Sequence, residues 1–551
     1  MKNIKNKFIK IVAVFSFMFL GCESEILDKD PTTTISDNAV WSSIDLAADY
    51  LNSAYNDGIE TVEAQRWPTS ITDDACQRGN QDMWQFTTGS VTPSSFGYAT
   101  FWKKYNTIRI VNFFLENIDQ LAETNLEEVS LLKAEARFIR AKCYADLVNF
   151  YSWWEGEENG VPLITKSHSV GDDYEVARSN YDDVIEFIVS ELDEAMEDLP
   201  AVWDDSEWGK PTKGACMALK SRQLLYAASK LHNPGNVQAE WQKASDAAFS
   251  LITDPLYSLV QADTWQDYTN IWLDTDNSEI ILALPRNSDE AANWDLQQSP
   301  NGYRGRSGNC PTQDLVDDFE MEDGQSIQIS PLYDEQDPYI NRDMRFYANI
   351  VYNGRMYRGR EVEFFYPEDG SSVAAGVDSR ASNLDQQNAS PTGYTLYKYM
   401  DESIDIQETS SSVPWIIFRL AEMYLNYAEA QFHLGNEGVA KEYVNKVRGR
   451  AKMPDITSAG NQLLEDIRHE RRIELVFENY HRFCDVRRWE IVENTLEKDV
   501  GQINIYKDDA GNLRYERSVF QERTFQPKSY NFPIPLSERE KAPWLKQNPN
   551  Y

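Results

Sequence analysis

Residues 463–489, LLEDIRHERRIELVFENYHRFCDVRRW, decide how the rest of the chain is interpreted. Within them Ile473, Val476, Phe477 and Tyr480 follow the i, i+3, i+4, i+7 spacing that predicts one apolar stripe of an α-helix. Arginine and glutamate residues fill the positions between, which alone would indicate a solvated charged face. The block is better explained by a helix wedged between other helices, where arginine side chains hold neighbouring backbone carbonyl groups.

The charged residues of this stretch also have helical spacing. Glu465 precedes Arg468, and Arg471 precedes Glu474, by three residues, so each pair is predicted to meet on one helix surface. The basic end at Arg488 suits the negative pole of a helix dipole. We therefore expect the other helices of the fold to pack around this one.

The first thirty-five residues are predicted to lie outside the fold. A lysine-rich start precedes the apolar run 11–20, which has the length of a secretory signal and is too short to cross a bilayer. Leu20-Gly21-Cys22 resembles the bacterial lipoprotein signal, in which Cys22 becomes the lipidated first residue; a chance cysteine is the alternative. We expect a signal peptide over 1–21, a flexible tether over 22–35, and acyl chains as the only membrane anchor.

The charge of the chain limits the classes of partner that it can bind. The formal net charge is −36, and loss of four lysines with the signal makes it −36 − 4 = −40. Nucleic acid is excluded as a partner because phosphate binding needs a basic surface, and an anionic lipid surface is equally unattractive. The ligand is expected to be neutral unless a local basic patch overrides the global field.

The cysteines do not indicate a disulfide-dense scaffold or a zinc site. Besides Cys22 they are widely spread and form no CxxC pair: Cys76, Cys143, Cys216, Cys310 and Cys484. One or two bridges remain open in an oxidising compartment. Cys76 with Cys310 is the pair to test, since both lie in loop-like sequence.

Helical periodicity predicts a mostly α fold of stacked antiparallel helix pairs, similar to tetratricopeptide repeats. The predicted helices are 39–58, 102–121, 129–151, 181–199, 211–231, 241–252, 415–434 and 437–451. Turn signals crowd into residues 256–412, where the alternating runs 346–352 and 394–399 suggest hairpins. We expect one domain over 36–551: helical to 255, a loop-rich insertion over 256–412 that carries the ligand site, helical over 413–490, and an extended tail over 491–551.

Several motifs occur in order along nearly the whole mature chain. After the Cys22 motif they are AEARFIRA at 134–141, TKGA at 212–215, FEMEDG at 319–324, RLAE at 419–422, YAEA at 427–430, RHERRIEL at 468–475 and FPIP at 532–535. In combination they resemble the SusD-like (RagB/SusD) family of outer-membrane lipoproteins. The resemblance implies a tetratricopeptide-like scaffold, exposure on the outside of the outer membrane, and capture of oligosaccharide or polysaccharide for a SusC-like TonB-dependent transporter. It does not specify the glycan.

Glycan binding needs aromatic faces for sugar rings and planar polar groups for paired hydroxyls. Two loop-like segments outside any helical period offer this mixture. The first choice for a stacking platform is Trp84 with Asp74 and Arg78, facing Asn293, Trp294 and Tyr303, with Trp67 as a further candidate. For each tryptophan the alternative is a residue that packs a loop.

The insertion also repeats one tetrapeptide, Tyr-Arg-Gly-Arg, at 303–306 and 357–360. Converging copies could hold uronates or sulfates through bidentate arginine contacts, which makes secondary candidates of Arg304, Arg306, Arg358 and Arg360. The favoured interpretation is plainer: two glycine-centred turns whose arginines face nearby Asp and Glu residues.

Catalysis has little support in the sequence. HExxH, GxSxG, P-loop and GxGxxG motifs are missing, and the five histidines form no ligand set, so we expect no catalytic residue, metal or cofactor. A surface glycoside hydrolase stays open because it needs only two carboxylates. A helical-repeat module that binds peptides is the other alternative.

Overall fold

The computed structural model describes residues 40–59, 68–79, 81–95, 101–168, 175–286 and 293–551. The predictions for Cys22, the signal and the tether, and that for Trp67, therefore lie outside the described residues. Within the described ranges no helix is long and apolar enough to cross a membrane.

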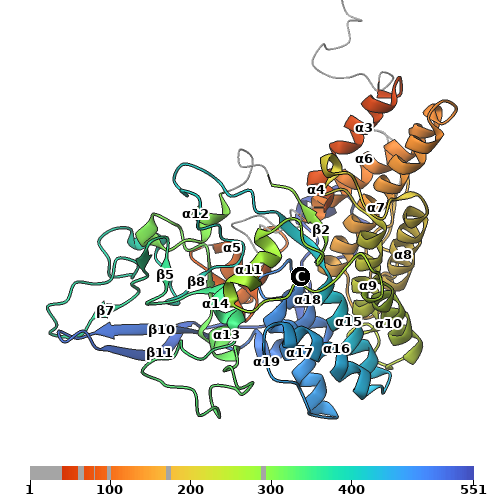
Figure 1. The fold of residues 1–551 in the computed structure, drawn as a ribbon. Helices are drawn as coiled ribbons and strands as arrows, with labels where there is room; N and C mark the ends of the chain where they lie inside the picture. Colours follow the sequence, from red (N-terminus) through yellow and green to blue (C-terminus); the bar gives the residue numbers. More distant parts are fainter. Residues whose placement is uncertain (1–39, 60–67, 80, 96–100, 169–174, 287–292) are drawn as a thin grey trace, which may run out of the picture.

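A layer of stacked helices forms the larger part of the molecule (Figure 1). Consecutive helices pack on each other from α6 to α10, α10 packs on α15, and α15 packs on α16 and α17. The prediction of a mostly α fold with paired helices is confirmed. The helices of this layer are α3 (Ile44–Asn52), α4 (Tyr55–Ile59), α6 (Lys104–Asn117), α7 (Leu126–Tyr151), α8 (Tyr181–Asp198), α9 (Lys213–Ala228), α10 (Gln238–Ile252), α15 (Leu420–His433), α16 (Glu437–Arg450), α17 (Asn461–Glu474) and α18 (His481–Arg488).

Local sequence signals explain where these helices begin and end. Asn180 and Asp183 form a capping box at the start of α8, which satisfies backbone N–H groups that have no partner within the helix. Thr212 caps α9 by accepting a hydrogen bond from the Ala215 N–H group at 3.2 Å. The apolar stripe of α8 then faces its neighbours, with Ile188 fully buried.

The predicted helix over 415–434 is wrong in its first turn. Trp415–Arg419 is strand β9, which pairs antiparallel with β2 (Ile280–Leu284), and helix α15 begins only at Leu420. Every residue of β9 is buried. The apolar run with Ile416 and Ile417 fits a buried strand as well as a helix, so periodicity could not separate the two.

The stretch 463–489 is likewise two helices and not one. α17 ends at Glu474 and α18 begins at His481, while Phe477 and Asn479 between them have positive φ values of 59° and 47°. Such left-handed residues cannot continue an α-helix. The apolar stripe is nevertheless buried, since Ile473, Val476 and Phe477 all belong to the main hydrophobic core.

As expected, an arginine of this stretch binds backbone carbonyl groups, including one in a neighbouring segment. The Arg487 guanidinium donates to the backbone carbonyl oxygens of Phe483 at 2.9 Å and Ser529 at 3.0 Å. The predicted pair of Arg468 with Glu465 is confirmed at 2.8 Å. The predicted pair of Arg471 with Glu474 is wrong, because Arg471 pairs with Asp485 of α18 at 2.9 Å.

Glu474 instead binds arginines from three other elements. It accepts from Arg419 of β9 at 2.6 Å, from Arg450 of α16, and from Arg345, which lies in the insertion, at 3.1 Å. All four side chains are buried. This network ties the helical layer to the insertion.

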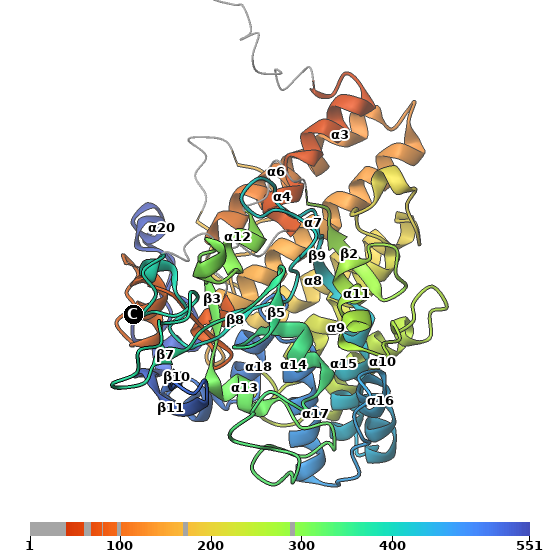
Figure 2. The same cartoon turned by 60° about the vertical axis from the view of Figure 1, so that its left-hand side comes forward.

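The remaining elements are short, and most of the strands among them lie on the side of the molecule away from α10 and α16 (Figure 2). The helices among them are η2 (Pro68–Ile71), α5 (Gln81–Thr87), η4 (Ile118–Leu121), η5 (Asp205–Glu207), α11 (Trp265–Leu273), α12 (Trp294–Gln298), η6 (Asn301–Tyr303), α13 (Gln313–Asp318), α14 (Met344–Asn349) and η7 (Gln386–Asn388). The strands are β1 (Ala75–Gln77), β3 (Asn309–Pro311), β4 (Ile350–Val351), β5 (Met356–Tyr357), β6 (Arg360–Glu361), β7 (Tyr366–Pro367) and β8 (Thr395–Leu396).

Short antiparallel pairs organise this insertion. β1 pairs with β3, β4 with β8, and β5 with β6. The runs 346–352 and 394–399, predicted to form hairpins, pair with each other through β4 and β8, and the first run starts in α14. Most side chains of the two runs are buried, which fits a strand and a helix equally.

The prediction that 491–551 is an extended tail is wrong for much of its length. The segment contains α19 (Val492–Thr495), the hairpin of β10 (Val500–Lys507) and β11 (Leu513–Gln521), η8 (Pro527–Tyr530) and α20 (Leu536–Lys541). The hairpin projects away from the helical layer in Figure 1. Its alternating residues and the Ala510-Gly511 turn are hairpin signals that the proline-rich end of the tail obscured.

Candidate functional site

The β1–β3 pair brings the first predicted loop and the insertion to one rim of the molecule. Gln77 of β1 pairs with Asn309 of β3, and beyond the strand the Arg78 N–H group donates to the Gly308 carbonyl oxygen at 3.3 Å. The Arg78 guanidinium donates through Nε to the Arg306 carbonyl oxygen at 2.9 Å. Two segments far apart in sequence therefore place their arginines side by side.

Trp84 stands beside this rim on helix α5. Its indole Nε1 lies 3.4 Å from the carbonyl oxygen of Gln77, while Met83 and Phe86 of the same helix are buried. The two buried side chains fix the helix and leave the Trp84 side chain 39% exposed. An exposed indole held on a rigid element is suited to stacking.

Asp385 completes this surface from the insertion. The Asn301 amide donates to the Asp385 carbonyl oxygen at 3.1 Å, which places η7 next to η6. Burial lowers the pKa of Arg78, and the Asp385 carboxylate opposes that shift. We name the group Arg78, Trp84, Arg306 and Asp385 the β1–β3 surface. Arg304 is exposed beside it.

Asp74, predicted to face the ligand, lies inside the protein. Its side chain accepts a hydrogen bond from Arg472 Nε of α17 at 2.8 Å, and the residue is 1% exposed. Burial raises the pKa of Asp74 although Arg472 acts against the shift. Asp74 therefore anchors the strand β1 to the helical layer, and its assignment to the binding surface is wrong.

Trp294 and Asn293 are also structural. Trp294 is 1% exposed, its Nε1 donates to the Lys398 carbonyl oxygen at 3.1 Å, and its ring meets Trp415 edge-on at 5.4 Å. Asn293 caps α12, accepting from the Leu296 N–H group at 2.8 Å. A buried indole offers no face to a sugar, so the prediction of Trp294 as a stacking residue is wrong.

The two Tyr-Arg-Gly-Arg copies lie side by side, and their residues contact mainly each other. Tyr303 and Tyr357 pack with ring centroids 5.0 Å apart, and the Arg360 guanidinium covers the Tyr303 ring at 3.8 Å. The favoured interpretation, arginines that face carboxylates, is confirmed for the second copy, since Arg360 binds Asp378 at 2.7 Å and Arg358 binds Asp295 at 2.8 Å. In the first copy both arginine side chains are exposed.

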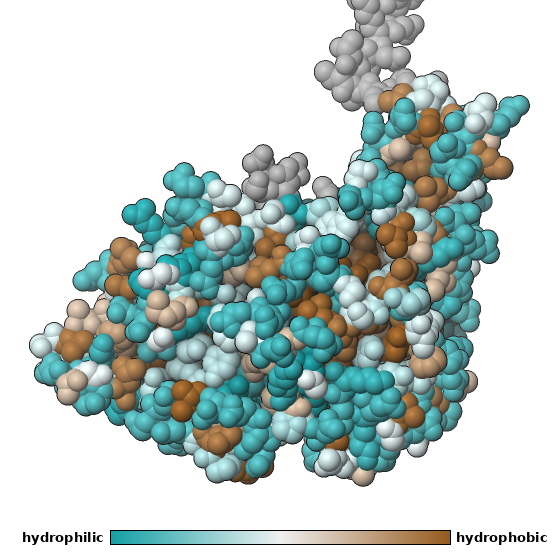
Figure 3. Space-filling view, in the orientation of Figure 1, coloured by the Kyte–Doolittle hydropathy of each residue, from teal (hydrophilic) through white to brown (hydrophobic). Residues whose placement is uncertain are grey.

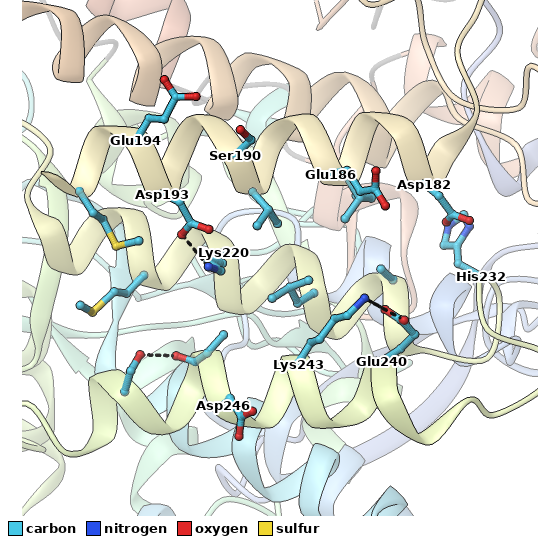
Figure 4. Close-up of a pocket in the computed structure, with 18 of the residues that line it drawn as sticks. Asp182, Glu186, Ser190, Asp193, Glu194, Lys220, His232, Glu240, Lys243 and Asp246 are labelled. Atoms are coloured by element: carbon cyan, nitrogen blue, oxygen red, sulfur yellow. Dashed lines mark hydrogen bonds and ion pairs between the residues drawn. The ribbon is translucent and has the colours of Figure 1, made fainter.

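The exposed acidic face of the helical layer carries a groove of about 1140 Å³ between α8, α9 and α10 (Figure 4). Its floor is apolar, with Met217 and Leu224 of α9. Lys220 pairs with Asp193 at 2.6 Å and Lys243 with Glu240 at 2.9 Å, so the lysines are neutralised within the groove. No Phe, Tyr or Trp occurs among the described residues that line it, which makes the groove a poor platform for sugars.

Sequence reasoning missed Asp385 and the groove for different reasons. Asp385 follows Leu384 in a stretch without aromatic residues or periodicity, so nothing local marks it. The groove is built from outward-facing residues of three helices whose polar faces look like ordinary solvated surface. Figure 3 shows that hydrophilic residues cover most of the face in view, so charge alone does not single out a site.

Comparison with known proteins determines the family of the chain. A family model described as "SusD family" matches residues 263–551, more than half of the 551 residues. The chain belongs to the SusD family. A second model, described as "Starch-binding associating with outer membrane", matches residues 25–225. In this SusD-family chain the β1–β3 surface draws Arg78 and Trp84 from the second match and Arg306 from the first.

Individual relatives agree with this assignment. A SusD-like protein from Bacteroides fragilis has a solved structure with a TM-score of 0.79 and 30% identity, covering 95% of this chain and all of that one. A SusD-like carbohydrate-binding protein from the same species has the same fold, with a TM-score of 0.74, 24% identity, and 92% and 99% of the two chains covered. A SusD-like protein of Formosa agariphila is 23% identical over 98% of each chain.

Proposed function

We propose that this SusD-family protein binds oligosaccharide or polysaccharide at the β1–β3 surface. The observation that carries the proposal is Trp84: an indole 39% exposed on a helix that two buried neighbours hold in place. A pyranose ring stacked on the indole would lie next to the end of β1, because Trp84 Nε1 lies 3.4 Å from the carbonyl oxygen of Gln77, the residue before Arg78. The Asp385 carboxylate is close enough to Arg78 to influence the pKa of that arginine. The starch-binding family model that matches residues 25–225 and the carbohydrate-binding relative from Bacteroides fragilis support carbohydrate as the ligand class.

The energetics call for several such contacts. Each aromatic contact adds only about 0.5–1.5 kcal/mol beyond its buried area. A dissociation constant between about 1 mM and 1 µM corresponds to roughly −4 to −8 kcal/mol, so stacking must be joined by hydrogen bonds from the polar groups of the surface. The net charge of −36 favours a neutral glycan, and the exposed Arg304 and Arg306 are the groups that would accept an anionic one.

The proposal also includes the membrane anchor of the protein and the transporter that receives its ligand. Cys22 would carry the lipid anchor, and the protein would face the exterior of the outer membrane and pass glycan to a SusC-like TonB-dependent transporter. The Leu20-Gly21-Cys22 motif supports the anchor. Cys22→Ala should leave a folded protein that no longer fractionates with membranes in a strain without the transporter; retention of that variant would contradict the anchor.

A panel of purified polysaccharides tests the binding proposal. The protein is run through gels that contain each polysaccharide, and the same mixtures are assayed for new reducing ends. Retardation by at least one glycan without new reducing ends supports binding. Release of reducing ends would favour the surface glycoside hydrolase, and no retardation by any member would contradict carbohydrate as the ligand.

A further inference from the structure

Cys76 and Cys310 lie directly opposite each other in the β1–β3 pair, where they are Cα partners. Two residues away, the Thr312 N–H group donates to the Asp74 carbonyl oxygen at 3.0 Å, which marks a hydrogen-bonded position of the ladder. Such positions recur every second residue, so the cysteines also occupy one, with Cα atoms about 5.5 Å apart. Disulfides join Cα atoms separated by about 4.4–6.8 Å.

The side chains of the pair point to the same side of the strands. Opposed residues share one face of a β-ladder, and both cysteines belong to a small buried cluster with Val500 and Phe520. The Cys310 thiol donates to the Ser307 carbonyl oxygen at 3.2 Å. Both thiols are free in the structure. A bond between the two sulfur atoms would require the Cys310 side chain to leave this hydrogen bond and the two Cβ atoms to approach each other.

We propose that Cys76 and Cys310 form a disulfide in the exported protein, by exchange with a protein that donates its own disulfide. The thiolate of one cysteine attacks the donor's disulfide, forms a mixed disulfide and releases one donor thiolate. The thiolate of the other cysteine attacks the sulfur of the first and expels the donor as a dithiol. The two cysteines lose two protons and two electrons, and the donor's disulfide gains them.

The burial of the pair decides when this exchange takes place. Desolvation raises the pKa of the Cys76 thiol well above its ordinary value and that of Cys310 to about 12. Thiolates are the reactive form, so the folded protein presents almost none. The disulfide therefore forms while β1 and β3 are still accessible during folding, and it resists reduction once they are packed.

The cross-link would close a long loop, because the two cysteines are 310 − 76 = 234 positions apart. Such a loop restricts the unfolded chain strongly. It would also fix Arg78 relative to Arg306 at the end of the same strand pair. This second consequence rests on the proposed glycan site, whereas formation of the disulfide does not.

Peptide mapping of the wild-type protein tests the proposal. Cells that export the full chain are lysed directly into denaturant with N-ethylmaleimide, and the protein is digested without reductant. Cys143, Cys216 and Cys484 should be alkylated, and Cys76 should be recovered in one peptide cross-linked to Cys310. Alkylation of both Cys76 and Cys310, or a cross-link between any other pair, would overturn the proposal.

Cysteine variants provide a second, independent test of the disulfide. Cys216→Ser is the matched control and should keep the cross-linked peptide, whereas Cys310→Ser should leave Cys76 alkylated. Urea unfolding in the presence of reductant, which exposes the bridge, should lower the urea midpoint of the wild type and of the control and leave that of the Cys76→Ser, Cys310→Ser double variant unchanged. An equal effect of reductant on the double variant would contradict the bridge. If the wild-type protein gives the cross-linked peptide but no polysaccharide retards it, only the proposed function is contradicted.

Discussion

At the scale of single residues, Trp84 and Trp294 take opposite roles although both come from sequence without helical period. Trp84 is 39% exposed on α5, and Trp294 is 1% exposed beside Trp415. The difference arises from what covers each ring in three dimensions. The segment containing Lys398, more than a hundred residues further along the chain, closes over Trp294 and accepts its hydrogen bond.

Trp294→Ala is therefore expected to lower the free energy of unfolding by about 3–5 kcal/mol, the usual cost of a cavity left by a buried tryptophan. Trp84→Ala should change it by less than about 0.5 kcal/mol, since the exposed ring packs little of the core. Urea unfolding of both variants checks this. Equal losses would mean that Trp84 is also a packing residue.

Glu474 offers a second test at this scale. Burial alone would raise its pKa, but Arg450, Arg419 and Arg345 outweigh burial and hold the pKa well below its ordinary value. Glu474→Gln leaves those arginines buried with one carboxylate fewer, so we expect a loss of about 3–5 kcal/mol in the free energy of unfolding.

Glu465→Gln is the matched control for Glu474→Gln. Glu465 is 59% exposed and its partner is Arg468, so this change should cost at most about 1 kcal/mol. Thermal and urea melts of the two variants compare the buried network with a surface pair. Similar small losses in both would show that the buried network contributes little to stability.

The charged residues of the stretch 463–489 also show what could be predicted from residues alone. The i, i+3 rule correctly paired Glu465 with Arg468, because both lie on one continuous surface of α17. It failed for Arg471 and Glu474, whose partners come from α18 and from other elements. A local rule describes exposed pairs, whereas buried charges take their partners from the packing of distant segments.

At the scale of elements, the turn between β5 and β6 depends on an unusual backbone. Arg358 and Gly359 both have positive φ, 45° and 86°, as a two-residue hairpin turn requires. Gly359→Ala meets no neighbouring atom within 4 Å, so its cost is conformational only, about 1–2 kcal/mol. The midpoint of urea unfolding measures it.

Gly438→Ala is the control for that turn. Gly438 lies in α16 with open space around it and an ordinary helical backbone, so alanine there should raise the free energy of unfolding by about 0.5–1 kcal/mol. Opposite signs for the two substitutions are expected. A stabilising Gly359→Ala would contradict the left-handed turn.

Element prediction succeeded where helices are long and amphipathic and failed where apolar runs are short. α8 and α16 begin and end close to their predicted bounds, because an apolar stripe marks both and a capping box marks the start of α8. β9 was taken for the start of a helix, since a fully buried strand of five residues has no alternation to reveal it. Only its pairing with β2 distinguishes the two.

At the scale of the whole molecule, buried carboxylates make stability depend on pH. Burial raises the pKa of Glu429, but Arg488 outweighs it and lowers the pKa from 4.5 to about 2. The pKa of Glu470 and Glu478 is lowered in the same direction by their arginines, against the effect of burial.

A group whose pKa is lower in the folded state stabilises the fold above its unfolded pKa and loses that contribution as pH falls through the folded one. For Glu429 this window runs from 4.5 down to about 2 and is worth about 3 kcal/mol. The urea midpoint should begin to fall near pH 6.5, because burial lowers the pKa of His232 to about 3 and that of His433 to about 4, and it should fall more steeply below about pH 5 as these carboxylates are protonated. A constant midpoint down to about pH 3 would contradict the account of these pairs.

The overall architecture was predictable from order and periodicity, and the proposed binding surface was not. Helix pairs and an inserted loop region follow from local patterns, as the solved relative with 30% identity confirms for the fold. The β1–β3 surface exists only because residues 75–77 pair with residues 309–311. That long-range pairing decided which of the predicted site residues are exposed and which, such as Asp74, are buried.

Titration calorimetry of Trp84→Ala with the glycan best retained by the wild type tests the central claim most directly. Trp208→Ala is the matched control, since Trp208 is 37% exposed in the connection between α8 and α9. Trp84→Ala should weaken binding by at least about tenfold, or about 1.4 kcal/mol, with Tm unchanged, and Trp208→Ala should bind as the wild type does. Wild-type affinity in Trp84→Ala would contradict the assignment of glycan binding to the β1–β3 surface.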